Sequence, residues 1–186
     1  PNQTTTWRNA TLAVRSVLSL GVLSLDNCNL TVSETMLAAG NVRLDGGALR
    51  GGTIELRDDV ILTVRGNALL DGLTVKGNLA STAFDSFRLQ NGLTLEGTLR
   101  LEGSSLNIVG NQTLAGGTVE FVPGIQGAIN VPANTTLTLG PTTLVRGGDG
   151  FLQGDGTLQN QGTIRADQPG RNLTVRTKGF ANTGTL

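Results

Sequence analysis

Short triplets, each with a polar residue between two apolar residues, recur along most of the chain. They are Leu30-Thr31-Val32, Val42-Arg43-Leu44, Leu62-Thr63-Val64, Leu73-Thr74-Val75, Leu93-Thr94-Leu95, Leu99-Arg100-Leu101, Val119-Glu120-Phe121, Leu137-Thr138-Leu139 and Leu173-Thr174-Val175. Successive side chains of a β-strand point to opposite faces, so the outer two residues of each triplet would face a core and the middle one would face solvent. Thr and Val also suit a pleated sheet. The pattern predicts an all-β protein built from many short strands.

Glycines divide these strands at a regular spacing. Gly52, Gly72 and Gly92 follow one another at intervals of about 20 residues, as do Gly97 and Gly117, and each opens a short apolar segment. Self-similarity at such a period indicates a solenoid, in which each repeat buries its apolar face against its neighbours. If each coil consists of two or three short strands and successive coils stack ~4.8 Å apart, the chain should form about nine coils and a rod roughly 40 Å long.

The predicted fold class is therefore all-β, a single-stranded parallel β-helix with coils of about 20 residues. The crossover rule for parallel strands favours a right-handed coil. Pro123, Pro132 and Pro141 recur at a short, even spacing, and we expect them at corners because proline cannot donate to a central ladder. No linker divides the chain, so residues 1–186 are predicted to form one β-solenoid domain.

Two segments depart from the strand pattern. Ser33 to Gly40 has a Ser, a Glu and an apolar run that favour one turn of helix. Ala80 to Ser86 is predicted to be a loop that leaves one coil. Because binding residues are often carried on loops, either segment is a candidate for recognising a glycan or a host surface.

The composition is that of a folded, weakly charged chain. Hydrophobic residues make up 38% and charged residues 15%, which is too apolar for a disordered chain. Lys+Arg and Asp+Glu are both 14, and the charges are interleaved singly, so no basic block is available for nucleic acid. No apolar run is long enough to span a bilayer, and we expect no membrane insertion.

Little of the side-chain chemistry that enzymes use is present. The chain has no histidine, so Cys28 has no imidazole base beside it, and we expect a buried thiol. β-Helix glycosidases and lyases need clustered carboxylates, for which Arg57-Asp58-Asp59 is the best local candidate. Asp also favours turns, so these three residues are predicted to form a polar turn. We expect no enzymatic activity and no cofactor.

One glycine-rich segment has the character of a calcium loop. Asp149 and Asp155 lie within GGDGFLQGDG, where two carboxylates stand beside flexible backbone carbonyls. The segment does not repeat the nonapeptide of calcium-binding β-helices, and Asp in a glycine-rich stretch is typical of turns. Asp149 and Asp155 are therefore weak calcium candidates.

Several motifs resemble those of a known class of proteins. LTLEGTL at 93–99, LAGGTVEF at 114–121, GDGTLQNQGTI at 154–164 and FANTGTL at 180–186 are similar to the β-helical repeats of bacterial surface proteins of the filamentous-haemagglutinin and autotransporter-passenger type. The resemblance covers most of the chain from Leu12. It implies a right-handed parallel β-helix, export to the cell surface, and a role in adhesion or in a sheath or filament.

The sequence thus predicts a non-enzymatic module of an extracellular filament, sheath or stalk, with an adhesin or a polysaccharide-cleaving enzyme as alternatives. The final segment is strand-like and carries no polar cap, and an open β-helix end exposes unpaired backbone groups. We expect that end to pair with another copy, or with the next part of a longer chain. The expected interface residues are Phe180, Asn182, Thr183, Thr185 and Leu186.

Overall fold

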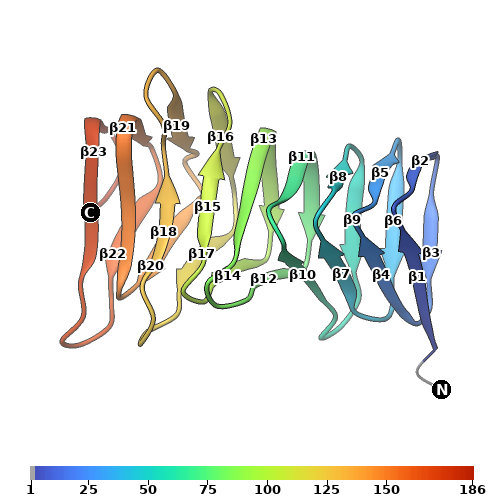
Figure 1. The fold of residues 1–186 in the computed structure, drawn as a ribbon. Helices are drawn as coiled ribbons and strands as arrows, with labels where there is room; N and C mark the ends of the chain where they lie inside the picture. The colour runs from blue at the N-terminus through green and yellow to red at the C-terminus, as the bar shows by residue number, and fades with distance from the viewer. Residues whose placement is uncertain (1–2) are drawn as a thin grey trace.

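The computed structural model describes residues 3–186, which wind into a β-solenoid of about nine coils (Figure 1). The regular elements of this part of the chain are all strands, and neighbouring strands pair in parallel. The chain enters at one end of the rod and leaves at the other (Figure 1). The predicted fold class is confirmed. Within residues 3–186 there is no helix long and apolar enough to cross a membrane.

One side of the rod is a nine-stranded sheet that takes one strand from each coil. In order along the rod its strands are β1 (Thr4–Arg8), β4 (Val22–Asp26), β7 (Val42–Asp45), β10 (Ile61–Arg65), β12 (Asn78–Ser81), β14 (Thr98–Leu101), β17 (Thr118–Phe121), β20 (Leu144–Gly147) and β22 (Thr163–Ala166). Nine strands in one ladder agree with the number of coils that the glycine spacing predicts.

A 14-stranded sheet forms the other two sides of each coil. Its strands are β2 (Thr11–Val14), β3 (Val17–Ser19), β5 (Asn29–Val32), β6 (Thr35–Ala38), β8 (Ala48–Arg50), β9 (Thr53–Leu56), β11 (Ala68–Lys76), β13 (Ser86–Glu96), β15 (Ser105–Ile108), β16 (Gln112–Ala115), β18 (Gly127–Asn130), β19 (Thr136–Leu139), β21 (Gly150–Asn160) and β23 (Leu173–Asn182). Strand β11 pairs with both β8 and β9, so one long strand takes the place of two short ones.

The coils are not all of the same length. In the nine-stranded sheet the shortest step runs from Ile61 of β10 to its partner Asn78 of β12, and the longest runs from Thr118 of β17 to its partner Leu144 of β20. That longest coil contains Pro123, Pro132 and Pro141, and all three lie outside strands. The prediction that these prolines mark corners is confirmed.

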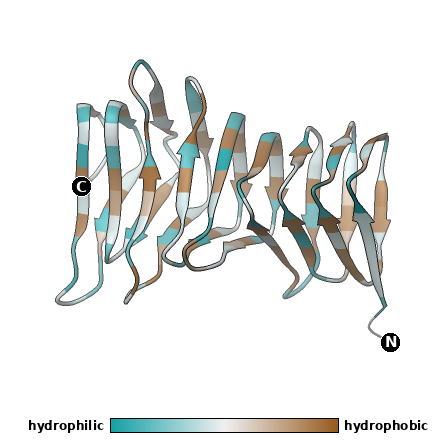
Figure 2. Ribbon diagram, viewed as in Figure 1, coloured by the Kyte–Doolittle hydropathy of each residue, from teal (hydrophilic) through white to brown (hydrophobic). Residues whose placement is uncertain are grey.

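The apolar positions of the triplets form a continuous core along the rod. Leu30 and Val32 are fully buried, whereas Thr31 between them is exposed, as the alternation predicts. Figure 2 shows the same alternation of hydrophobic and hydrophilic residues along the strands. Phe87 and Phe121 are the largest side chains that are fully buried. The interior is therefore a packed column of side chains.

Glycines occupy corners for two distinct physical reasons. Gly52 has a φ of 68°, a conformation that side-chain-bearing residues rarely adopt. Gly97 has no such φ, but a β-carbon there would collide with the backbone carbonyl oxygen of Gly77 in the preceding coil. The regular spacing of glycines thus marks places where the backbones of successive coils approach closely.

The two predicted departures from the repeat have different outcomes. The expectation of a helical turn in Ser33 to Gly40 is wrong, because β6 forms there and pairs with β3 and β9, with Met36 and Ala38 fully buried. The loop expected at Ala80 to Ser86 is confirmed in part. Strand β12 continues to Ser81, which leaves a turn at 82–85 with Phe84 at 87% exposure.

Candidate functional surfaces

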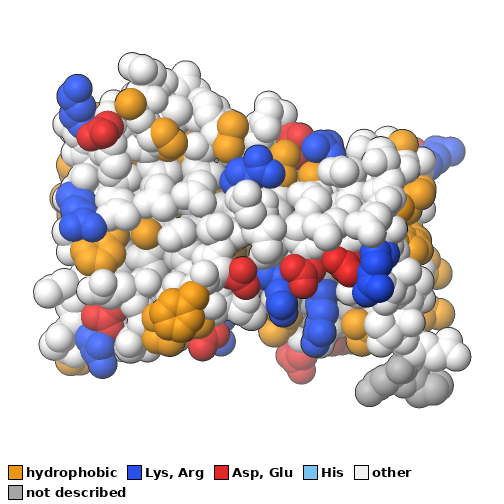
Figure 3. All heavy atoms as spheres, in the orientation of Figure 1, with side chains coloured by type: hydrophobic (Ala, Val, Ile, Leu, Met, Phe, Trp, Pro, Cys, Tyr) orange, Lys and Arg blue, Asp and Glu red, His pale blue; other side chains and the backbone are white. Residues whose placement is uncertain are grey.

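The outer surface is organised by ion pairs that join neighbouring coils. Nine of the ten ion pairs in residues 3–186 connect one coil to the next: Arg8–Asp26, Arg15–Glu34, Arg50–Asp71, Arg65–Asp45, Lys76–Glu55, Arg100–Glu120, Arg146–Glu120, Arg146–Asp167 and Arg171–Asp149. Figure 3 shows basic and acidic side chains next to one another on the visible face. Exposed pairs are individually weak, contributing about 0–1 kcal/mol each. Their regularity shows that outward charges are matched between coils.

The carboxylates proposed for a carbohydrate enzyme lie in an exposed turn. Arg57, Asp58 and Asp59 are all exposed, and Asp58 has a φ of 53°. The turn borders a shallow hollow whose other lining residues come from 20–22 and 39–41, together with Val60. Asp58 and Asp59 are the only titratable side chains that line this hollow. The residues thus form the polar turn that the sequence predicts.

The two calcium candidates do not converge. The carboxylate of Asp149 accepts a hydrogen bond from the Gly124 backbone N–H at 2.9 Å and pairs with Arg171 at 2.6 Å. Asp155 lies further along β21, beyond an extended stretch of strand that separates it from Asp149 by on the order of 15–20 Å. Among the described residues, no group of three or more acidic or cysteine side chains is placed to hold a metal ion.

Cys28 belongs to the core rather than to a site. Its side chain is fully buried, and burial raises the pKa of the thiol, an effect that a hydrogen bond with the backbone of Ala10 partly offsets. A thiol with a raised pKa is a poor nucleophile at neutral pH. The sequence prediction of a buried cysteine is confirmed.

At the C-terminal end, the 14-stranded sheet stops at an open edge. Strand β23 spans ten residues, and within residues 3–186 it pairs with β21 on one side only. In the nine-stranded sheet, the chain begins a further step beyond β22, where Thr185 forms an isolated parallel bridge to Thr163. The edge of β23 therefore presents unpaired backbone N–H and C=O groups to solvent, and such an edge is a template for another strand.

The last coil also leaves part of the core uncovered. Phe180 continues the inward row of Leu137 and Leu158, both fully buried, yet is itself 43% exposed. Leu186 is 69% exposed. Asn160, at 1% exposure, donates a hydrogen bond of 2.7 Å to the side-chain oxygen of Asn182, which occupies the same position one coil further on. A covering coil would bury these inward side chains.

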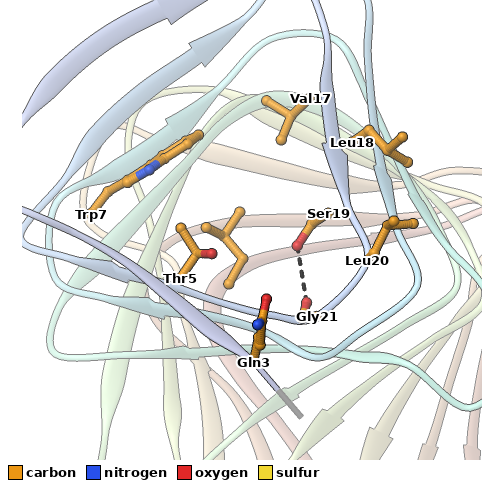
Figure 4. Close-up of a pocket in the computed structure, with 9 residues that line it drawn as sticks. Gln3, Thr5, Trp7, Val17, Leu18, Ser19, Leu20 and Gly21 are labelled. Atoms are coloured by element: carbon orange, nitrogen blue, oxygen red, sulfur yellow. Dashed lines mark hydrogen bonds between the residues drawn. The ribbon is translucent and has the colours of Figure 1, made fainter. Parts of the chain in front are cut away.

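The N-terminal end is open as well, with a different surface. A hollow lies in the cross-section of the first coil, and Figure 4 shows Thr5, Trp7 and Val17 around it. At its rim, the Ser19 hydroxyl donates a hydrogen bond of 3.0 Å to the backbone oxygen of Gly21. Nearby, Leu18 is 65% exposed and Leu20 is 77% exposed. The strands of this coil, β1, β2 and β3, are all short.

Comparison with protein-family models, with curated proteins and with solved structures gave no match to this chain. The resemblance to bacterial surface β-helices rests on the repeat motifs quoted above. Export and a surface location therefore remain predictions.

The structure brings together the C-terminal residues that the sequence singled out. Phe180, Asn182, Thr183, Thr185 and Leu186 all lie in the last coil. Sequence reasoning missed the exposed apolar surface at the other end, around Trp7, Leu18 and Leu20. The single tryptophan and the tight spacing of leucines over 12–25 were signals that could have pointed to it.

Proposed function

We propose that this chain is a non-enzymatic structural module, a rigid segment of an extracellular bacterial filament, sheath or stalk that is extended by stacking further β-solenoid coils on its ends. The observation that carries this proposal is the open edge of β23 together with the inward but half-exposed Phe180. One cover would suit both features, namely a strand that pairs with β23 and places an apolar residue over Phe180.

The interior supports a role as a rigid spacer. Adjacent coils are joined by two continuous sheets, and the core column runs through all of them without a break. In such a solenoid each coil contacts only its neighbours, so length can grow without changing the packing of the existing coils. The placement outside a bacterial cell is supported by the resemblance of the repeat motifs.

A coil appended to the C-terminus tests the proposal. Leu186 lies in the row of Leu99, so a copy of residues 100–119 joined directly after Leu186 would continue the register. We expect the appended coil to fold and to slow hydrogen exchange of the β23 amides. A matched control replaces the copies of Leu101, Leu106 and Ile108 with serine. If the unmodified appended coil stays disordered and β23 exchanges as before, the end does not accept a stacked coil.

A second candidate function, recognition of a glycan or host surface, is favoured by the turn at 82–85. Phe84 is 87% exposed at its tip and has a φ of 64°, which is unusual for an aromatic residue. Strained, exposed residues are found at binding loops. A glycan array probed with the protein and with Phe84→Ser tests this role. Binding that the substitution abolishes would support it, and an array without hits would argue against it.

A further inference from the structure

Outward charges are distributed unevenly along the rod. The last coil, residues 163–186, contains four basic residues and one acidic residue: Arg165, Arg171, Arg176 and Lys178 against Asp167. Residues 3–21 contain Arg8 and Arg15 and no acidic residue. Because the whole chain has 14 basic and 14 acidic residues, acidic residues outnumber basic ones in the coils between the first and the last. Both ends of the rod are therefore basic.

Neither of the two basic residues of strand β23 has an acidic partner among residues 3–186. Arg176 donates a hydrogen bond to the side-chain oxygen of Gln153 at 2.9 Å and lies over the ring of Phe151, 4.3 Å from its centre. Lys178 forms no ion pair among residues 3–186. Asp155 lines the same hollow as both cations, but it belongs to none of the ion pairs found within residues 3–186. Elsewhere on the rod, outward cations are mostly paired with a carboxylate on the adjacent coil.

A second copy of this chain would not supply the missing carboxylates. Residues that pair from coil to coil form rows along the rod, and Thr11 lies in the row of Arg176 while Thr6 lies in the row of Arg165. If the first coil of a second copy stacked on the last coil in the same register, Thr11 would therefore meet Arg176 and Thr6 would meet Arg165. Because residues 3–21 contain no acidic residue, a stacked first coil would bring no carboxylate to the C-terminal edge, and charge complementarity would be missing.

We propose that the C-terminal edge, formed by β23 with Arg176 and Lys178, binds a β-strand whose outward residues are acidic and whose inward residues are apolar, and that this partner is not a second copy of the chain. The inference rests on the proposed function, because it assumes that a further coil stacks on the C-terminal end and specifies the chemistry of that coil. The backbone of the edge would supply affinity through strand addition, and the two cations would select the partner.

The test uses two ten-residue peptides that differ only in outward charge. One has the β23 sequence, LTVRTKGFAN, and the other is LTVETEGFAN, with both basic residues replaced by glutamate. Binding of each labelled peptide to the full chain is measured by fluorescence anisotropy at low and high salt. We expect the acidic peptide to bind about tenfold more tightly at low salt, and the difference to shrink at high salt. Equal binding, tighter binding of the basic peptide, or no binding of the acidic peptide would overturn the inference.

Charge reversal on the protein provides the control. The double variant Arg176→Glu/Lys178→Glu should reverse the preference in favour of the basic peptide. Arg43→Glu/Arg57→Glu makes the same change in net charge at two exposed residues away from the end, and should keep the original preference. Sedimentation of the unmodified chain without peptide should show monomers, and concentration-dependent rods would contradict the choice of partner. If the peptide experiment fails but the appended coil still folds, the proposed charge selectivity is wrong, whereas the proposed structural role still holds.

Discussion

A single row of inward side chains behaves differently in the middle of the rod and at its end. Leu106, Ile129 and Leu152 are buried, whereas Val175, which continues the row in the last coil, is only partly buried. The residue types are alike, and the backbone is a strand in each case. What differs is the number of neighbouring coils, which is two for the first three residues and one for Val175.

In this fold, how deeply an apolar side chain is buried therefore depends on whether a coil lies on each side of it. An apolar residue is covered by its counterparts on both sides, so a terminal coil keeps only part of the hydrophobic stabilisation that an internal coil has. The backbone follows the same rule, since the outer edge of β23 pairs with no other strand of the described part of the chain. Ends are therefore the places where stability is lowest and where a partner gains most.

The largest expected difference between the regions concerns two phenylalanines. Phe87 is fully buried between coils, so Phe87→Ala should lower the free energy of unfolding by about 3–5 kcal/mol. Phe180 is 43% exposed, and Phe180→Ala should cost about 1 kcal/mol or less. Urea unfolding followed by circular dichroism measures both. Equal losses would show that the last coil is as well covered as the middle ones.

Substitutions at two glycines distinguish the two reasons for glycine in this fold, which are close approach of neighbouring coils and a positive backbone φ. In Gly97→Ala the new methyl group would meet the Gly77 carbonyl oxygen, so we expect a loss of about 3 kcal/mol in the free energy of unfolding. Gly170 has a φ of 71° but open space around it, so Gly170→Ala should cost only about 1 kcal/mol. If the ranking is reversed, close approach between coils is not what requires glycine at position 97.

The smallest effect concerns Cys28, which lies one coil from the N-terminal end. Ala10 is its neighbour in the first coil, so opening of that coil would expose the thiol. We expect a thiol reagent to label Cys28 slowly, through opening of the first coil. The labelling rate should exceed the rate at which the whole protein unfolds. Labelling at the global unfolding rate would contradict fraying of the first coil.

The same thiol sets a direction for pH dependence. Burial raises the pKa of Cys28 in the folded state, so on raising the pH the thiol of the unfolded chain ionises first. The folded state binds more protons in that range, and its stability should fall as the pH passes the ordinary thiol pKa. Cys28→Ala should remove this part of the pH dependence in urea unfolding curves.

Much of the fold could be predicted because alternation and glycine spacing are local signals. The triplet around Thr31 and the corner at Gly97 needed no knowledge of the neighbours. The segment Ser33 to Gly40 was misjudged because Glu34, Met36 and Ala38 are good helix formers, while pairing of β6 with β3 and β9 overrides that preference.

The candidate surfaces were less predictable, for a physical reason. Which cation meets which carboxylate depends on the register between coils, and the coil length varies along the rod. Arg146, for example, pairs with Glu120 across the longest coil, which a strictly constant period would not place together. The exposure of Trp7 and Phe180 likewise depends on which coil is terminal.

Hydrogen exchange resolved along the chain tests most directly whether each coil is held by its neighbours. We expect the slowest exchange in the central strands β8, β11 and β13, and progressively faster exchange toward β1–β3 and β23. Protection of the β23 amides equal to that of β13 would contradict this view, because an edge strand with one partner would then be as stable as a strand with two.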